Sequence, residues 1–416
     1  MPQTLRVRLQ PTVRRAEEAA APRLLQPWPD VVLGATDKGL EQAVPVCPTP
    51  SAMFGPRGGA LLPDGSLWMA DTGHHRLLGW KTRPVADNAA ADFVVGQPDF
   101  FCEGRNGKSS VTAFSLNVPT GVTACGQGLA VADAWNHRVL LWHETPRRHN
   151  QPADVVLGQA AFNDGAGNRG ADAPTAETMF WPYGIYWDGA RLWVSDTGNR
   201  RVLMWEGLPA RNGQAADLVL GQMDFTVRDE NGGGEPSASS MRWPHSIALW
   251  RGRLCVTDAG NNRVMAWRHI PRRDNAPCDF VLGQKDFASV DHNQSGYFPD
   301  AACLNMPYGL ASVGDWLLAA DTASSRLLGW RADDDANGAP ARRLAAQNSF
   351  QDKGDNRWQT PARDSICWPY GLYAQGDTVL VSDSGNNRAL LWRVADEMRL
   401  TTGARTALSA DEPPGE

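Results

Sequence analysis

A ten-residue pattern recurs six times along this chain, and its regular spacing restricts what the chain can fold into. Each copy reads Asp, four residues, Arg, three residues, Trp, as in DTGNRRVLMW from Asp196 and DSGNNRALLW from Asp383. The copies begin at Asp71, Asp133, Asp196, Asp258, Asp321 and Asp383, so that successive copies lie 62 or 63 residues apart. Self-similarity at a constant period indicates an array of equivalent structural units rather than one irregular fold.

Each unit contains four short apolar runs that are bounded by turn residues. The first follows Pro-x-Gly, as in WPYGIYW from Trp181, and the second ends at the aspartate, as in RLWVSD from Arg191. The third ends at the tryptophan, and the fourth precedes Gly-Gln, as in DLVLGQ from Asp217. Such runs predict β-strands. Small sheets of this kind bury their faces when they are arranged radially, which predicts an all-β fold, a six-bladed β-propeller of four-stranded antiparallel blades.

The two ends of the repeat array complement each other. A Gly-Gln-type strand stands alone near the start, as DVVLG from Asp30, whereas the last unit stops after its third strand at Trp392. We therefore expect the N-terminal strand to complete the last blade beside residues 389–392. This pairing closes the ring and leaves no exposed strand edge at the seam.

The repeat also sets the expected domain boundaries. The propeller is predicted to span residues 28–396, between a flexible N-terminal segment at 1–27 and a flexible C-terminal tail at 397–416. In the fifth unit, the Gly-Gln strand reads ARRLAAQ and places Ala346 where the other units have glycine. This replacement predicts a distorted strand.

The DTGNNRVLxW-type segment, following Pro-x-Gly and an apolar strand, resembles the NHL repeat, and the resemblance covers roughly residues 28–396. It implies a propeller but no particular activity, because the family includes an amidating lyase, RNA-binding domains and extracellular sensor domains of kinases.

We interpret the residues that recur in every unit as structural and not as catalytic. Each aspartate is expected to cap the following turn through backbone N–H groups and to pair with the arginine five positions later. These arginines are Arg76, Arg138, Arg201, Arg263, Arg326 and Arg388. The recurring tryptophans, expected to pack between blades, are Trp80, Trp142, Trp205, Trp267, Trp330 and Trp392.

Function is expected where the units differ. The residue between Pro and Gly is Arg57, Thr120, Tyr183, His245, Tyr308 and Tyr370 in the successive units. These residues are predicted to ring the channel mouth, where they either contact a polar ligand or a partner's side chain or simply plug the channel. Loops of about twenty residues, at 101–117, 163–180, 226–242, 288–305 and 351–367, are expected on the same face, where binding usually occurs. The tryptophans that precede Pro-x-Gly (Trp181, Trp243 and Trp368) are interpreted as wedges, with carbohydrate stacking as the alternative.

Composition narrows the classes of ligand and compartment. The formal charge of −6 argues against nucleic acid as the main ligand, and no apolar run is long enough to span a bilayer. Seven cysteines without a CxxC pair indicate a reducing compartment, so the chain is expected to be cytoplasmic. The eight histidines lack zinc-type spacing, and no cofactor is predicted. A central calcium ion and a metal-binding cluster of the loop cysteines Cys47, Cys303 and Cys367 are the alternatives left open.

The sequence therefore favours a non-catalytic binding propeller that uses the loop-bearing face and the channel mouth. Another protein is the expected partner, with the chain as subunit or assembly factor of a complex, and a small polar ligand is the alternative. A metal-assisted lyase or hydrolase at the channel mouth and an RNA-binding domain remain as competing functions.

Overall fold

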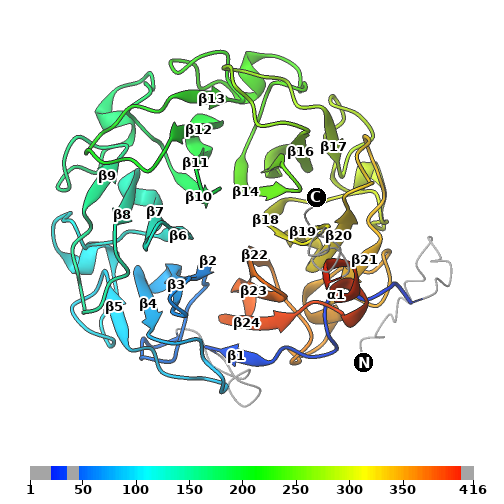
Figure 1. Cartoon of the computed structure of the whole chain (residues 1–416), viewed down its shortest axis with the longest axis horizontal. Coiled ribbons are helices and arrows are strands. Elements are labelled where there is room, and N and C mark those ends of the chain that lie inside the picture. Colours follow the sequence, from blue (N-terminus) through cyan, green and yellow to red (C-terminus); the bar gives the residue numbers. More distant parts are fainter. Residues whose placement is uncertain (1–19, 35–45, 404–416) are drawn as a thin grey trace, which may run out of the picture.

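Six four-stranded antiparallel sheets stand around a central axis in the computed structural model, which describes residues 20–34 and 46–403 (Figure 1). This arrangement confirms the predicted all-β, six-bladed β-propeller. In each blade the first strand lies nearest the axis and the fourth lies at the rim (Figure 1). The six blades therefore present the starts of six first strands to one channel.

The strand bounds repeat from blade to blade. Blade one comprises β2 (Gly58–Leu61), β3 (Leu67–Asp71), β4 (Arg76–Trp80) and β5 (Phe93–Val95), and blade two comprises β6 (Pro119–Cys125), β7 (Gly128–Asp133), β8 (Arg138–Trp142) and β9 (Val155–Leu157). Blade three comprises β10 (Pro182–Trp187), β11 (Arg191–Asp196), β12 (Arg201–Glu206) and β13 (Leu218–Leu220), and blade four comprises β14 (Pro244–Trp250), β15 (Arg253–Asp258), β16 (Arg263–Trp267) and β17 (Phe280–Leu282). Blade five comprises β18 (Pro307–Val313), β19 (Trp316–Asp321), β20 (Arg326–Arg331) and β21 (Arg343–Ala345).

Blade six is built from both ends of the described chain, as predicted. Its strands are β22 (Pro369–Gln375), β23 (Thr378–Asp383), β24 (Arg388–Arg393) and β1 (Val31–Leu33). Strand β1 pairs antiparallel with β24 and places Val31 opposite Leu391 and Leu33 opposite Ala389. The ring is closed by backbone hydrogen bonds between residues that are far apart in sequence.

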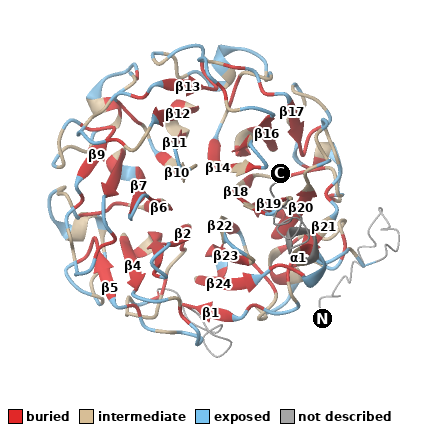
Figure 2. Ribbon diagram, viewed as in Figure 1, coloured by how far each residue is buried: buried red, intermediate tan, exposed pale blue. Residues whose placement is uncertain are grey.

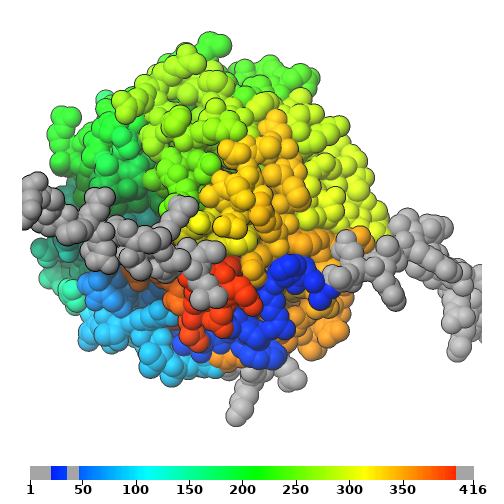
Figure 3. All heavy atoms as spheres, turned by 45° about the vertical axis from the view of Figure 1, so that its right-hand side comes forward, coloured from blue at the N-terminus to red at the C-terminus, as the bar shows by residue number. Residues whose placement is uncertain are grey.

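Residues ahead of β1 also contact the ring. The Leu24 N–H donates to the Leu344 carbonyl at 2.9 Å, and Leu24 and Leu25 are buried. In Figure 3 this blue segment lies against the red helix α1 (Asp396–Gly403). The chain therefore packs on blades five and six from Ala21 onward, whose N–H donates to the Asn348 carbonyl at 3.3 Å. Segments 1–19 and 404–416 of the predicted flexible ends lie outside the described residues.

The expected distortion of the fifth Gly-Gln strand is wrong. Strand β21 pairs with β20 over three residues in the same register as its counterparts, with Leu328 opposite Leu344. The strain is confined to Ala346, whose φ of 70° takes the left-handed conformation of the glycines in the other units. Such a conformation costs an alanine about 1–2 kcal/mol, and the strand pairing holds it in place.

The core lies between adjacent blades, where the recurring tryptophans are buried as predicted. Figure 2 shows buried residues concentrated in the strands and exposed residues in the connecting loops. Trp142 packs in one cluster with Trp68 of the neighbouring blade. Its indole N–H donates to the Gln151 carbonyl at 2.9 Å, and Trp392 uses the Gln26 carbonyl of the N-terminal segment in the same way, at 2.7 Å. The indoles thus hold the chain that leads to each outer strand.

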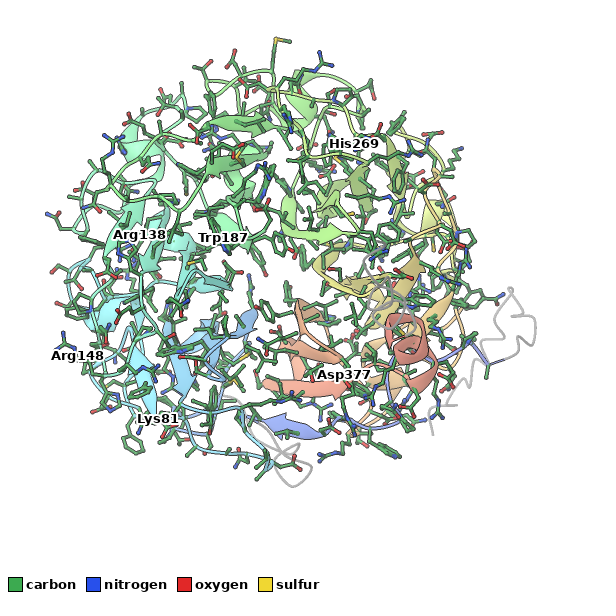
Figure 4. The ribbon with its side chains drawn as sticks, viewed as in Figure 1. Lys81, Arg138, Arg148, Trp187, His269 and Asp377 are labelled. Atoms are coloured by element: carbon green, nitrogen blue, oxygen red, sulfur yellow. The ribbon has the colours of Figure 1, made fainter. Side chains whose placement is uncertain are left out.

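The recurring aspartates and arginines form a buried network, which we call the Asp–Arg belt. In blade three, Asp196 Oδ2 accepts from Arg201 Nε at 2.9 Å and from Asn199 Nδ2 at 2.7 Å. Asp196 Oδ1 accepts the Phe180 N–H at 2.7 Å, and all three polar side chains are fully buried. Arg138, labelled in Figure 4, makes the equivalent pair with Asp133. The predicted pairing is confirmed, but the aspartate accepts a backbone N–H from the segment that leads into the first strand, and it holds the following turn through the Asn199 side chain and not through backbone N–H groups.

The belt also holds the long loops, which resemble one another from unit to unit more than their sequences suggest. Arg201 Nη2 donates to the carbonyls of Thr175 and Thr178, both at 2.9 Å. Asn168 of the same loop exchanges two amide hydrogen bonds with Asn199 of the turn, at 3.0 and 2.8 Å. The loops are therefore anchored parts of each unit, and their anchored ends position the side chains at the channel mouth.

Candidate functional site

The Pro-x-Gly segments bring the variable residues of the six units together at the axis. The glycine is required there because neighbouring first strands approach closely: a Cβ on Gly184 would lie 1.8 Å from the His245 carbonyl oxygen. The same approach lets Thr120 Oγ1 donate to the Tyr183 carbonyl at 2.9 Å. The residues between Pro and Gly consequently meet across the channel.

Five of these six residues form what we call the axial plug: Arg57, Tyr183, His245, Tyr308 and Tyr370. Ring centroids are 4.3 Å apart for Tyr183 and His245, 4.1 Å for His245 and Tyr308, and 4.7 Å for Tyr308 and Tyr370. The Arg57 guanidinium carbon lies 4.7 Å from the Tyr370 ring centroid and 5.8 Å from that of Tyr183. The structure thus brings together the residues that the sequence placed at the channel mouth, and they close the channel.

The plug carries one unneutralised positive charge. Coulombic interaction with Tyr183 raises the pKa of Arg57, and its other charge interactions are with Tyr370 and Tyr308. Burial raises the pKa of Tyr308 to about 12, so this phenol is neutral at physiological pH. No carboxylate of the described residues forms an ion pair with Arg57.

His245 is also neutral. Burial lowers its pKa to about 3, and its Nδ1 lies 2.9 Å from the Trp243 carbonyl oxygen. Since a carbonyl only accepts, Nδ1 carries the proton and Nε2 is a hydrogen-bond acceptor. The imidazole is therefore a neutral acceptor at physiological pH.

The plug separates two cavities. The first, which we call the mouth cavity, has a volume of about 300 Å³ and lies on the loop-bearing face. Its floor consists of the plug residues Arg57, Tyr183, His245 and Tyr308, whereas Tyr370 does not line it. Its walls include Trp135, Phe180, Trp181, Trp243, Arg200 and Arg228. The inner cavity, of about 200 Å³, is lined by the first strands. One of its lining residues is Trp187 at the end of β10, which is labelled in Figure 4.

Trp135 breaks the repeat at the turn after the second strand. The equivalent residue is Gly73, Gly198, Gly260, Ala323 and Gly385 in the other blades. A Cβ on Gly198 would lie 2.1 Å from the ring of Phe180, whereas blade two has Asn117 in place of that phenylalanine. The smaller asparagine therefore makes room for Trp135, whose side chain is 56% exposed at the mouth cavity.

Arg200 is a second departure from the repeat. It lies in the turn of blade three, two residues after Gly198, which is the equivalent of Trp135. The equivalent side chains accept an N–H from the following blade: His137 Nδ1 accepts from Trp181 at 3.1 Å, and Asn262 Oδ1 accepts from Met306 at 2.7 Å. A guanidinium cannot accept, so the Trp243 N–H donates to the belt residue Asp258 instead, at 3.1 Å. The Arg200 side chain lines the mouth cavity.

The tryptophans before Pro-x-Gly are exposed rather than wedged between strands. Trp181, Trp243 and Trp368 are 48%, 38% and 50% exposed. Trp181 and Trp368 adopt positive φ values of 53° and 48°, a conformation that an L-residue keeps only when its surroundings impose it. Trp181 and Trp243 line the mouth cavity, and Trp368 lies outside it.

Our comparison of the six repeats did not identify three residues of the mouth cavity. Trp135 and Arg200 depart from the residue types at their repeat positions, and an alignment of the turns alone would have revealed both. Arg228 lies in a long loop, at a position that varies among Glu103, Gly165, Val290 and Lys353 in other units, and its guanidinium carbon lies 4.9 Å from the Phe180 ring centroid.

The described residues contain no group of three or more His, Cys, Asp or Glu side chains that could hold a metal ion. The loop cysteines do not gather: Cys47 is exposed, whereas Cys303 is buried in its own loop, where it accepts the Asp300 N–H at 3.1 Å. No helix in the described part of the chain has the length and apolar character needed to cross a membrane. The absence of a cofactor stays a prediction.

Comparison with known families and structures concerns the fold. The NHL repeat family matches residues 241–265, which include β14 and the turn after β15. No curated protein matches the chain in sequence. A protein of unknown function from Bacteroides thetaiotaomicron is 12% identical with a TM-score of 0.48, covering 83% of this chain and 70% of that chain. Kuenenia stuttgartiensis hydrazine synthase is 12% identical with a TM-score of 0.46, covering 85% of this chain and 99% of that chain. Virginiamycin B lyase from Staphylococcus aureus is 12% identical with a TM-score of 0.39, covering 82% of this chain and 96% of that chain.

Proposed function

Since the chain belongs to the NHL-repeat propellers, we propose that it is a non-catalytic binding propeller whose ligand occupies the mouth cavity. The observation that carries this proposal is that two departures from the repeat, Trp135 and Arg200, come from different blades and line the same cavity.

The scaffold requires neither departure. Trp135 exposes more than half of its surface at a position where four other blades have glycine. Arg200 replaces a residue type that elsewhere accepts a hydrogen bond from the next blade, and the Trp243 N–H donates to Asp258 instead. Departures from a repeated pattern at one place are expected where function requires them.

The size of the mouth cavity favours a small ligand over the protein partner that the sequence suggested. Its volume of about 300 Å³ is at the lower end of known small-molecule sites. Its lining combines flat aromatic walls with a few polar groups on the floor, which is the composition of a site that orients a ligand. A single side chain of a partner protein is the alternative occupant.

No specific observation favours the metal-assisted lyase or hydrolase. His245 is the one histidine that lines the mouth cavity among the described residues, and its neighbours are aromatic rings and Arg57. With a pKa of about 3, its imidazole is a weak base at neutral pH. Binding without chemistry is therefore the function that the site supports best.

The test is recovery of a bound small molecule from protein purified under mild conditions, by native mass spectrometry of the intact protein. We expect the wild type to carry a ligand that the Trp135→Gly variant loses. The matched control is Trp28→Gly, which removes an exposed tryptophan next to β1 at the outer rim.

Equal retention by wild type and Trp135→Gly would contradict the proposal. A second protein that co-purifies with the wild type and is lost in Trp135→Gly would instead support the protein-partner interpretation.

A further inference from the structure

Three arginines line the mouth cavity without a carboxylate beside them. They are Arg57 on the floor and Arg200 and Arg228 in the wall, and no Asp or Glu of the described residues contributes to the lining. None of the three forms an ion pair with a described carboxylate. By contrast, Arg242, whose guanidinium lies over Trp243 next to this cavity, pairs with Glu230 at 2.9 Å. The cavity is therefore a concentration of uncompensated positive charge in a protein whose net charge is −6.

Arg57 is the most costly of these charges. Its guanidinium is enclosed by the phenol rings of Tyr183 and Tyr370, which supply π-electron density but no negative charge. A buried cation without a counter-ion is unfavourable unless something else neutralises it. Arg57 also has a side-chain hydrogen bond with Tyr183. A guanidinium carries five N–H donors, so the others can give two parallel bonds to an anion.

Arg200 and Arg228 are held by backbone carbonyl groups, which carry no formal negative charge. Arg200 Nη1 donates to the Arg228 carbonyl at 3.0 Å, and Arg228 Nη1 donates to the Asp172 carbonyl at 3.3 Å. Arg200 Nε is buried and has no hydrogen-bond acceptor among the described residues. These contacts orient both guanidinium groups at the cavity wall and leave donors unused.

The remaining wall is flat and aromatic. Trp135, Trp181 and Trp243 each expose more than a third of their surface and line the cavity from three consecutive blades. The His137 Nδ1 and Trp243 carbonyl contacts fix the backbone on which these rings stand. Rings of this kind bind planar groups by stacking, at little cost in conformational entropy.

Resting on the proposed function, we infer that the ligand of the mouth cavity is a small organic anion with a flat aromatic ring. Its anionic group neutralises Arg57, with Arg200 and Arg228 nearby, and its ring stacks on the tryptophan wall. Carboxylate and phosphate share this chemistry, because a guanidinium pairs with either through two parallel hydrogen bonds. The cavity volume of about 300 Å³ suits a molecule of one or two fused rings.

Isothermal titration calorimetry with matched probes tests this inference. The probes are 2-naphthoate and 2-naphthyl phosphate as anions, 2-naphthamide as the neutral analogue of the same ring system, and inorganic phosphate as an anion without a ring. We expect at least one naphthyl anion to bind ten or more times more tightly than the amide. The two anions separate carboxylate from phosphate as the natural group.

Arg200→Asn is the variant of choice because asparagine occupies the equivalent position in Asn262 and Asn387, so the turn is expected to fold. It should lower the affinity for the anion several-fold and leave that for the amide unchanged. Arg272→Asn is the matched control, since Arg272 lies in a separate cavity of the described residues, beside Asp217 and Leu218 of the outer strand. It should change neither affinity.

Equal binding of amide and anion would overturn the inference but keep the proposed binding site. Binding of no naphthyl probe would overturn the inference, whereas the proposed binding site is tested separately by the native mass spectrometry of wild type and Trp135→Gly. Inorganic phosphate that binds as tightly as naphthyl phosphate would show that the aromatic wall plays no part, and would overturn the inference as well.

Discussion

The Asp–Arg belt and the mouth cavity are built from the same turns, but the belt residues are nearly the same in every blade and the cavity residues differ between blades. In the turn of blade three, Asp196, Asn199 and Arg201 are fully buried; the aspartate and the arginine recur in every blade, and the asparagine recurs in four. Gly198 and Arg200, which alternate with them, face the mouth cavity. The buried positions hold the backbone, and an outward position varies where its neighbour leaves room, as Asn117 does for Trp135 in blade two. One turn thus supplies both the scaffold and the site.

The largest expected effect comes from breaking the belt. Asp196→Ala leaves the Arg201 guanidinium buried without its carboxylate and frees the Phe180 N–H. We expect the free energy of unfolding to fall by about 3–5 kcal/mol, as measured by chemical denaturation.

Asp172→Ala, at an exposed aspartate of the same loop, is the control and should change stability little. Wild-type stability in Asp196→Ala together with loss of ligand binding would show that the aspartate belongs to the site and not to the scaffold.

An intermediate effect is expected from the plug and depends on pH. The pKa of His245 is about 3 in the folded protein and near 6.5 in the unfolded chain, so the unfolded state binds the proton first on acidification. Stability from this residue is therefore present above pH 6.5 and is lost as pH falls from 6.5 towards 3, by about 1 kcal/mol per pH unit.

His245→Phe should flatten this part of the pH profile by that slope, as seen in denaturation midpoints measured between pH 7 and pH 4. An unchanged slope would mean that His245 is not buried as a neutral group in the plug.

The smallest effect on stability is expected at the mouth. Trp135→Gly restores the residue type of four other blades and removes a side chain that is 56% exposed, so unfolding should change by less than about 1 kcal/mol.

The reverse substitution type, Gly198→Ala, should cost more, because its Cβ would lie 2.1 Å from the Phe180 ring. If Trp135→Gly unfolded the protein and Gly198→Ala did not, the explanation that Asn117 leaves room for Trp135 where Phe180 requires a glycine would be wrong.

Most of the fold could be predicted because it repeats. Each of the six copies of the pattern predicts the same strands, turn and buried tryptophan. Only the last blade lacks a fourth strand, so the strand that follows Asp30 is expected to pair there, beside β24. The prediction erred where a neighbour decided the outcome. Ala346 distorts no strand because the flanking ladder holds its backbone, and the belt aspartates accept a backbone N–H from a segment some sixteen residues earlier, not from the adjacent turn.

The amino-acid sequence by itself determined the number of blades, the closure of the ring and the identity of the residues at the channel mouth, because local strand and turn preferences repeat at a constant period. Only the tertiary structure decided that these residues close the channel as a plug, and that Trp135, Arg200 and Arg228 from separate segments share one cavity. The reason is geometric. Contacts across the axis depend on how closely neighbouring blades approach, and that distance is set by packing between blades and not within any one of them.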